Sequence, residues 1–553
     1  MPARATPARS SRARSRAASE LPSALRPSES SGSRYHRAVS LPPWLRRPPR
    51  WLAIALLVLS IEPVYATMAG GGSLREWPTW TRFYDLQAQG FRAGHLHLAR
   101  DPDPRVLAEK DRLNFALRSL WLWDASLYND RYYSYWGPLP ALVLAVSGAF
   151  LGVGSGLGDE VPTFALLSLQ LVAGALWIER VARRVFREVP LRRVLGAIVL
   201  FAFASPTPWM LARPAVYEGA IAGGAAFLLL GLVFAFDAVS AEPGSSESRR
   251  ALLLAGAAWA LGLACRVTIG PPAALLAAWT ALLLPLRAGR RVSPWAERVR
   301  AMAWMAAPLA ASALLLLLYN ELRFDSWLEF GTHYQLSTAR VHMSWSYVLP
   351  NLYSYLLRPV WVTCRFPFVM AMRIPDPSWF WAGFAPPEGY GTNERVAGML
   401  FVAPWILLAV PGLALAAGSA LAAARASGGL ASLEPRERGF LFCAVALPLA
   451  LANGVPMLGQ FVAIMRYLGD VAGALTLFGI FAAWALRERL AQATCVRRAL
   501  AVLVGVLAAV TIAAGILLGL QGPIDSFARL HPDTFVRLAR SLSICPPDAD
   551  PGP

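Results

Sequence analysis

Charged side chains are scarce in this sequence of 553 residues, in which Asp, Glu, Lys and Arg together make up 16%. A soluble globular protein has about a quarter of its residues charged, so this composition excludes an ordinary soluble protein. Hydrophobic residues make up 56% of the chain. The combination indicates a protein that lies largely within a lipid bilayer.

Cysteine is also scarce, with five residues in the chain and no pair in a CxxC arrangement. A disulfide framework and a zinc module both need clustered cysteines, so the sequence predicts neither. Acids are fewer than bases, 34 against 52, which gives a net charge of +18. No basic segment is interleaved with aromatic residues, so we expect no nucleic-acid partner and assign the charge to a basic tail and cytoplasmic loops.

The first 48 residues have few acids and almost no aliphatic periodicity. Such a segment cannot bury enough surface to offset its ordering entropy, so we predict a disordered basic tail over 1–48. It is too long and lacks the small-residue cleavage site that a signal peptide needs. Arg46, Arg47 and Arg50 precede the first apolar run and favour a cytoplasmic N-terminus.

Long apolar runs are what the sequence has in abundance. A helix needs about 20 apolar residues to cross a hydrocarbon core of about 30 Å. We therefore predict an all-α, polytopic helical membrane protein with its membrane domain at 49–522 and an extracytoplasmic tail at 523–553. The runs cover 51–67, 138–153, 163–178, 193–211, 217–236, 250–265, 268–286, 301–319, 394–418, 437–453, 465–486 and 498–520.

The distribution of arginine predicts which loops face the cytoplasm. Loops rich in Arg lie on the inside of a bacterial inner membrane, so two long outer loops are expected at about 68–137 and 320–393. The basic segment 179–193 falls inside only if 138–178 crosses an odd number of times, which predicts 11 or 13 spans. The three basic loops that set this pattern are 286–300, 422–438 and 486–498.

The first outer loop, 68–137, is the longest polar and aromatic segment in the first half of the chain. Helical periodicity places Asp85, Gln89 and Arg92 on one face. The loop ends in a run rich in Tyr and Trp at 132–138, and these side chains favour the membrane interface. We therefore predict an interfacial helix and a platform that carries carboxylates over the ends of the spans.

Ionisable side chains gather near the outer ends of the predicted spans, where a charge costs free energy unless it is paired or functional. A cavity with carboxylates beside arginines suits a substrate that carries phosphate and sugar. Arg266 has no acid nearby in sequence, so a phosphate is one candidate partner. The candidates are Glu76, Asp85, Asp124, Arg213, Glu218, Arg266, Arg323, Arg358, Arg466 and Asp470, together with Asn320, Tyr334, Gln335 and Tyr467.

Each candidate has a structural alternative. Asp85 could pair with an arginine of its own helix, since such pairs are common and weak. Arg213 and Glu218 lie five residues apart at the start of a span and could form a structural ion pair. The same alternative applies to Arg466 and Asp470. For these positions the sequence alone leaves both interpretations open.

Six short pieces of sequence follow one another in an order typical of one enzyme class. They are Tyr84–Ala88 with Gly94–Leu96, Asp124–Tyr128, Tyr132–Pro138, Arg213–Pro214 with Tyr217–Glu218, Tyr319–Asn320 with Arg323–Phe324, and Arg466–Tyr467 with Asp470. In this order, over about 51–486, the chain resembles the GT-C class of polytopic glycosyltransferases, which use polyprenyl-phosphate sugars. It is most similar to bacterial multi-span membrane proteins of that type.

The resemblance implies an inverting transfer from a polyprenyl-phosphate-linked sugar donor to a lipid, glycan or protein acceptor on the outer face of the inner membrane. An acid of the first loop would take the acceptor's proton, with Asp85 as first candidate and Asp124 as second. Arg266, Arg323 and Arg466 would stabilise the departing lipid phosphate. Membrane lipids are the other expected partners. No cofactor is assigned, and a divalent cation stays open.

The sequence departs from the family pattern at one place. Well-known members carry a pair of acids just upstream of the interfacial helix, where this chain has Thr79 and Trp80, and its nearest upstream acid is Glu76. Glu76 is therefore a third catalytic candidate. Two other functions stay open: a transporter or flippase for a lipid-linked or polyanionic substrate, and a non-catalytic membrane protein with a GT-C-like fold.

Overall fold

A computed structural model describes residues 49–111, 114–151, 156–204, 206–242, 244–284, 293–337, 342–373, 386–425, 430 and 433–545. The basic tail predicted at 1–48 and the last eight residues of the predicted C-terminal tail lie outside this part of the chain. From Arg50 onward the chain forms one compact unit, and the following description concerns that unit alone.

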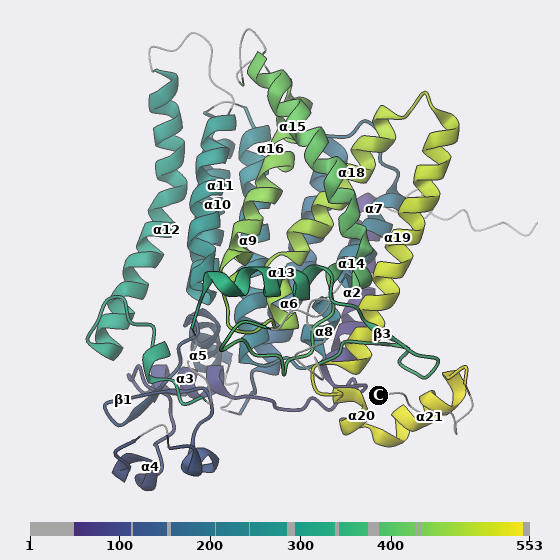
Figure 1. Ribbon diagram of the computed structural model, residues 1–553. Coiled ribbons are helices and arrows are strands. Elements are labelled where there is room, and N and C mark those ends of the chain that lie inside the picture. The colour runs from purple at the N-terminus through teal and green to yellow at the C-terminus, as the bar shows by residue number, and fades with distance from the viewer. Residues whose placement is uncertain are drawn as a thin grey trace, which may run out of the picture. The chain divides into compact units, whose positions relative to one another are not determined.

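The fold is a bundle of long apolar helices, as the sequence predicts (Figure 1). In the described part of the chain, seven helical stretches are long and apolar enough to cross a membrane. Their main helices are α2 (Arg50–Ala69), α6 (Glu160–Arg184), α9 (Val216–Ser240), α12 (Pro294–Phe324), α15 (Ala409–Arg425), α16 (Pro435–Ala450) and α19 (Thr494–Gln521).

Four further helices pack among these seven but are shorter or begin or end with charged residues. They are α7 (Leu191–Phe203), α10 (Ser246–Cys265), α11 (Gly270–Leu283) and α18 (Ala472–Arg489). Helix α10 packs along α9 and α12, and α18 packs against α15 and α16. Together with the seven long helices they account for eleven of the twelve predicted runs.

The twelfth run, predicted at 138–153, forms the short helix α5 (Leu139–Leu151). At 13 residues and 1.5 Å per residue it is only about 20 Å long, shorter than a hydrocarbon core, and α7 has the same length. It packs against α3 (Phe83–Arg92) instead. Of the described helices that begin between 138 and 178, only α6 is long and apolar enough to cross a membrane. The odd number of crossings predicted for this segment stays a prediction.

Helix α3 is the interfacial helix predicted in the first outer loop. Its N-terminus is capped by a residue that is distant in sequence. The Asp159 carboxylate accepts hydrogen bonds from the backbone N–H groups of Phe83 and Tyr84 at 2.8 and 2.7 Å. The Tyr84 hydroxyl donates to the Val216 carbonyl at 3.1 Å and ties α3 to the start of α9. The buried position of Asp159 raises its pKa from 3.8 to about 6.

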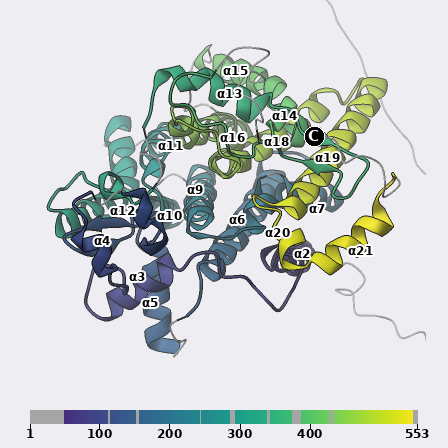
Figure 2. The ribbon, with the colours of Figure 1, turned by 60° about the horizontal axis from the view of Figure 1, so that its bottom comes forward.

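The remaining elements are short and lie mostly at the end of the bundle that holds α3, as Figures 1 and 2 show. Strand β1 (Ser126–Tyr128) pairs antiparallel with β2 (Arg131–Tyr133), and β3 (Trp361–Val362) pairs with β4 (Val369–Met370). The short helices are α4 (Pro104–Ala108), α8 (Thr207–Leu211), α13 (Val348–Leu356), α14 (Met399–Val402), α17 (Val455–Leu458), α20 (Ser526–Leu530) and α21 (Pro532–Leu542).

A disulfide joins Cys364, which follows β3, to Cys545 at the end of the described chain. The sequence did not predict this bond, because the two cysteines lie 181 residues apart and local spacing cannot show that they meet. The bond brings the second long loop and the C-terminal tail to the same end of the bundle, where the topology drawn from the basic loops had placed both.

Small residues let the helices approach closely. A Cβ atom added to Gly256 of α10 would lie 2.2 Å from the Met305 carbonyl oxygen of α12, so the two backbones touch at this point. The centre of the bundle is filled by large rings, among them Trp177, Phe236 and Phe442, whose ring centroids lie about 6 Å apart.

We expect Gly256→Ala to lower the thermal stability of the purified protein. Alanine improves helix propensity by about 1 kcal/mol, but the clash with the α12 backbone should cost about 1–3 kcal/mol because neither backbone can move freely. The matched control is Gly505→Ala in α19, where an added Cβ meets no atom within 4 Å. Equal melting temperatures for the two variants would contradict the close contact of α10 and α12.

Candidate functional site

A polar hollow of about 520 Å³ opens at the end of the bundle that carries the long loops. Its wall combines the first outer loop, the start of α9, the α10–α11 connection, the second outer loop and the segment before α18. Predicted site residues that line it are Asp124, Arg266, Gln335, Arg466, Tyr467 and Asp470. Residues up to 346 positions apart in sequence therefore meet in one hollow, as the sequence predicts.

Asp124 lies just before strand β1 and is held in an unusual conformation. Its φ angle is +65°, a left-handed value that non-glycine residues seldom adopt. The backbone N–H of Asp124 donates to the Leu336 carbonyl at 3.0 Å, and an isolated bridge pairs Ser126 with Gln335. The second loop therefore fixes this acid in place, and such local strain is found most often at functional sites.

The carboxylate of Asp124 accepts two hydrogen bonds in the hollow. The Tyr217 hydroxyl donates to one oxygen, and the Gln335 amide donates to the other at 3.0 Å. Tyr135 lies beside them and accepts from Gln335 at 3.4 Å. Burial, together with the negative charge of Asp124, raises the pKa of Tyr135 well above its usual value, so Tyr135 stays a neutral hydroxyl.

The Tyr217 ring connects this acid to a cluster of arginines. The Arg466 guanidinium lies 4.7 Å from the centre of the Tyr217 ring, and Arg213 lies 5.8 Å from it. Arg466 also lies 5.5 Å from the centre of the Tyr467 ring. Stacking on aromatic rings holds a guanidinium without using its N–H groups, which stay available to a ligand.

Several polar atoms in this cluster have no partner. Among the described residues, the buried Nε atoms of Arg213, Arg266 and Arg466 and the Oε2 atom of Glu218 make no hydrogen bond. Buried polar groups are nearly always bonded, so each unpaired one asks for an explanation. A ligand with anionic oxygens would supply acceptors for the three arginines at once.

Arg266 has a protein partner that the sequence could not identify. Its Nη2 donates to Asp470 at 2.7 Å, and Asp470 in turn accepts from the Asn453 amide at 3.0 Å. The Thr268 hydroxyl donates to the Asn453 amide oxygen at 2.7 Å. Asp470 therefore pairs with Arg266 from a distant connection, and the alternative of a local pair with Arg466 is wrong.

A second hollow, of about 200 Å³, adjoins the first. Arg213 and Glu218 line it, and it shares Arg466 and Glu394 with the larger hollow. Within the described chain, no ion pair joins Arg213 to Glu218, so their proposed structural pairing is not found. Arg466 occupies the wall between the hollows and faces the charges of both Glu218 and Glu394.

Other predicted residues lie away from these hollows. Asp85 is buried and accepts from Gln89 at 2.9 Å and from the backbone N–H of Gly156 at 3.1 Å. Glu76 is exposed in the turn after α2. Neither acid lines the hollow around Asp124, although the sequence ranked Asp85 first.

Arg323 makes structural contacts. It donates to the Ser134 carbonyl at 2.5 Å and to the Asn320 side chain at 2.9 Å, and its guanidinium stacks on the Tyr319 ring at 3.8 Å. Tyr334 packs its ring against Tyr128 at 4.6 Å, outside the hollow. The loops are thus held together by three residues that the sequence predicts to bind substrate, namely Asn320, Arg323 and Tyr334. Arg358 behaves likewise, since it donates to the Met372 carbonyl at 2.6 Å.

Sequence reasoning missed several residues of the hollow. Tyr217 and Tyr135 were noted only as parts of motifs, and Glu394 and Asn453 were not considered. Asn453 had a weak signal, because it is a polar residue at the end of a predicted apolar run. Glu394 had a similar weak signal, because it is the first residue of the predicted run 394–418.

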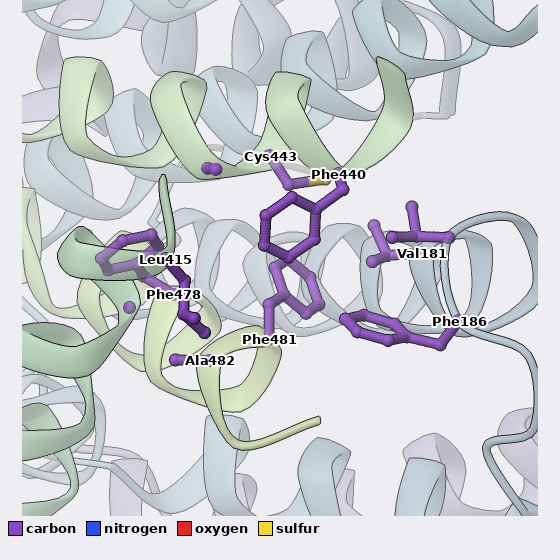
Figure 3. Close-up of a pocket in the computed structure, with 11 residues that line it drawn as sticks. Val181, Phe186, Leu415, Phe440, Cys443, Phe478, Phe481 and Ala482 are labelled. Carbon is purple, nitrogen blue, oxygen red and sulfur yellow. The ribbon is translucent and has the colours of Figure 1, made fainter. Parts of the chain in front are cut away.

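Two further features of the described chain are a small apolar cavity and the distribution of its metal-ligating residues. A small cavity of about 10 Å³ inside the bundle is lined by apolar side chains such as Phe440, Phe478 and Phe481 (Figure 3), so it is a packing void. In the described part of the chain, no group of three or more His, Cys, Asp or Glu residues could hold a metal ion.

No protein-family model and no curated protein matches this sequence. Among solved structures, the chain is similar to the oligosaccharyltransferase of Archaeoglobus fulgidus in the apo form, with 13% identity, a TM-score of 0.45, and coverage of 86% of this chain and 56% of that one. The archaeal enzyme AglB, solved with an inhibitory peptide and dolichol-phosphate, matches with 13% identity, a TM-score of 0.41, and 88% and 56% coverage.

ArnT from Cupriavidus metallidurans, bound to undecaprenyl phosphate, matches with 14% identity, a TM-score of 0.35, and coverage of 89% of this chain and 78% of that one. This chain thus spans about half the length of the oligosaccharyltransferase. These proteins are glycosyltransferases of the GT-C class, the class that the sequence resembles. At these identities and TM-scores, the likeness assigns neither a reaction nor a substrate to this chain.

Proposed function

We propose that this protein is a membrane glycosyltransferase that moves a sugar from a polyprenyl-phosphate donor to an acceptor in the hollow around Asp124. One observation carries the proposal. A carboxylate held in a strained conformation contacts the same tyrosine as an arginine whose Nε atom makes no hydrogen bond within the described chain. An acid beside free guanidinium groups is the pair that transfer from a phosphate leaving group requires.

Asp124 is the proposed general base. A carboxylate has about four lone-pair sites, and Tyr217 and Gln335 occupy two of them, so room remains for an acceptor hydroxyl. The acceptor oxygen attacks C1 of the sugar while Asp124 takes its proton. The bond between C1 and the phosphate oxygen breaks, and the electron pair leaves with the lipid phosphate. Attack opposite to the leaving group inverts the configuration at C1.

Arg466 and Arg266 are the proposed phosphate-binding residues. Guanidinium groups form paired hydrogen bonds with phosphate oxygens, and these bonds strengthen as charge develops on the leaving group. The aromatic rings of Tyr217 and Tyr467 orient Arg466, and Asp470 orients Arg266. In the described chain, the buried Nε atom of each arginine makes no hydrogen bond.

The proposal includes an orientation in the membrane. The Arg-rich ends of α6, α18 and α19 lie together at one end of the bundle, since the backbone N–H of Arg187 donates to Glu488 at 2.8 Å. The loops that form the hollow and the Cys364–Cys545 disulfide belong to the other end. The positive-inside rule then puts the N-terminus in the cytoplasm and the hollow on the outer side of a bacterial inner membrane.

A flippase would use the same charges without cleaving the donor, so the chemical readout separates the two functions. Purified protein incubated with polyprenyl-phosphate sugars should release lipid phosphate if it is a transferase. Movement of intact donor across vesicles with no release would favour the flippase.

Asp124→Asn should lower the rate of lipid-phosphate release about 10²- to 10⁴-fold, because the amide cannot accept the proton. Asparagine tolerates the left-handed conformation, so the variant should fold. The matched control is Asp85→Asn, another buried acid of the same loop, which should keep most of the activity. The opposite ranking would move the base to Asp85.

Arg466→Lys should lower kcat/KM for the donor about 10- to 100-fold, because a lysine neither stacks on Tyr217 in the same way nor presents paired donors. The measurement is the initial rate as a function of donor concentration. Arg131→Lys is the control, since Arg131 pairs with the exposed Asp101 at 2.6 Å away from the hollow. Unchanged kinetics in Arg466→Lys would exclude it from donor binding.

The orientation predicts the reactivity of Cys495, an exposed free cysteine at the start of α19. In intact spheroplasts a membrane-impermeant maleimide should not label Cys495, and permeabilisation should expose it. As a control, Asp101→Cys introduces an exposed thiol into the first loop and should react without permeabilisation. Labelling of Cys495 in intact spheroplasts would reverse the proposed topology.

A further inference from the structure

A second large hollow lies at the other end of the bundle, away from Asp124. It measures about 560 Å³ and lies between the α6–α7 connection and the α18–α19 connection. A neighbouring hollow of about 540 Å³ shares Arg193 and Arg487 with it. Five arginines and two glutamates line the larger one, namely Arg187, Arg193, Arg487, Arg489, Arg497, Glu188 and Glu488.

The arginines around this hollow lack partners of opposite charge. In the described part of the chain, none of the five makes an ion pair within 4.0 Å of a carboxylate. Arg193 is half-buried and lies within electrostatic reach of Arg192, Arg487 and Arg497. Like charges at such positions repel one another, so this cluster of arginines is electrostatically unfavourable by itself.

Two helix N-termini add to the positive potential of the same hollow. Helix α7 begins at Leu191 and α19 begins at Thr494, and neither has a side-chain cap or an acid in its first turn. A helix N-terminus favours negative charge, yet these first turns carry arginines such as Arg193 and Arg497. Both features point to an anion that compensates the helix ends and the arginines together.

The floor of the hollow is apolar. Phe186, Val189 and Trp484 are buried there, and the Phe186 and Trp484 rings meet edge to face at 5.5 Å. Helix α19 leaves the hollow with Val502, Leu503 and Val506 exposed along its outer side, as expected of a surface that faces lipid chains. A polar rim over an apolar floor beside such a helix matches a lipid in chemistry, since a lipid has a polar headgroup and apolar acyl chains.

We propose that this hollow binds the phosphate headgroup of an anionic glycerophospholipid from the leaflet at the basic end of the bundle. Arg193, Arg487 and Arg497 would bind the phosphate oxygens, and Phe186 and Trp484 would contact the glycerol and the first acyl carbons. Basic pockets between membrane helices suit such headgroups. The site is separate from the proposed sugar-transfer hollow and does not depend on that activity.

The test is thermal unfolding of the full-length protein in neutral detergent, titrated with cardiolipin, with phosphatidylcholine or with inorganic phosphate. Cardiolipin should raise the melting temperature in a saturable way, and phosphatidylcholine should not. Inorganic phosphate at equal concentration should have little effect, because it gains nothing from the apolar floor. An equal shift with inorganic phosphate would replace the lipid by a soluble anion and overturn the proposal.

The variant Arg193→Gln/Arg497→Gln should weaken cardiolipin binding at least about tenfold. Without lipid it should be at least as stable as the native protein, because it relieves repulsion, and this separates loss of binding from loss of folding. The control Arg249→Gln/Arg250→Gln removes the same charge from exposed positions at the start of α10, outside the hollow. Equal weakening in both variants would show only a general charge effect and refute a defined site.

Should the double variant not express, Arg487→Gln alone provides the same measurement. It should weaken binding of cardiolipin and raise the lipid-free melting temperature relative to the control. A lower lipid-free melting temperature together with unchanged cardiolipin affinity would mean that Arg487 has a structural role and that the hollow does not bind the headgroup.

Discussion

The hydrogen bond between Tyr217 and Asp124 is the contact on which the proposed site depends. It joins the first turn of α9, the most buried of the long helices, to an acid in the loop that lies over the bundle. The same tyrosine ring supports Arg466 from the segment before α18. Because one side chain contacts both charges, their separation is set by the size of a tyrosine ring and not by the flexibility of two loops.

Two other charged residues, Arg323 and Asp159, attach the loops to the bundle. Arg323 is enclosed by the Ser134 carbonyl, the Asn320 side chain and the Tyr319 ring, and its position fixes the end of α12 against the first loop. Asp159 caps α3 and holds that helix against the bundle. Charged groups that are fully paired therefore build the platform, and the groups left unpaired on it are the ones available to a ligand.

The two ends of the bundle use arginine differently. Around Asp124, arginines stand beside carboxylates and aromatic rings, so their charge is balanced before a substrate arrives. Around Arg193, arginines lie near one another and near two helix N-termini without side-chain caps, and the proposed lipid phosphate would balance this charge. An excess of basic residues at one end also agrees with a fixed orientation in the membrane.

The sequence by itself determined the helical membrane fold, the two long loops and the set of charges from which the site is drawn. Apolar length and arginine distribution are local properties, and a chain displays them without folding. The prediction of an odd number of crossings between 138 and 178 rests on charge alone, and α5 is one of the shorter apolar helices in that segment.

Only the tertiary structure decided which charges act together. From the sequence, Asp85 is the first candidate for the base and Asp124 the second, and Arg323 stands beside Arg466 as a phosphate-binding candidate. In the structure, Asp85 accepts hydrogen bonds from Gln89 and Gly156, Arg323 donates to Ser134, and the Nε atom of Arg466 makes no hydrogen bond within the described chain. The physical reason is that the partner of a buried charge comes from whichever distant segment packs against it, and no local pattern encodes that choice.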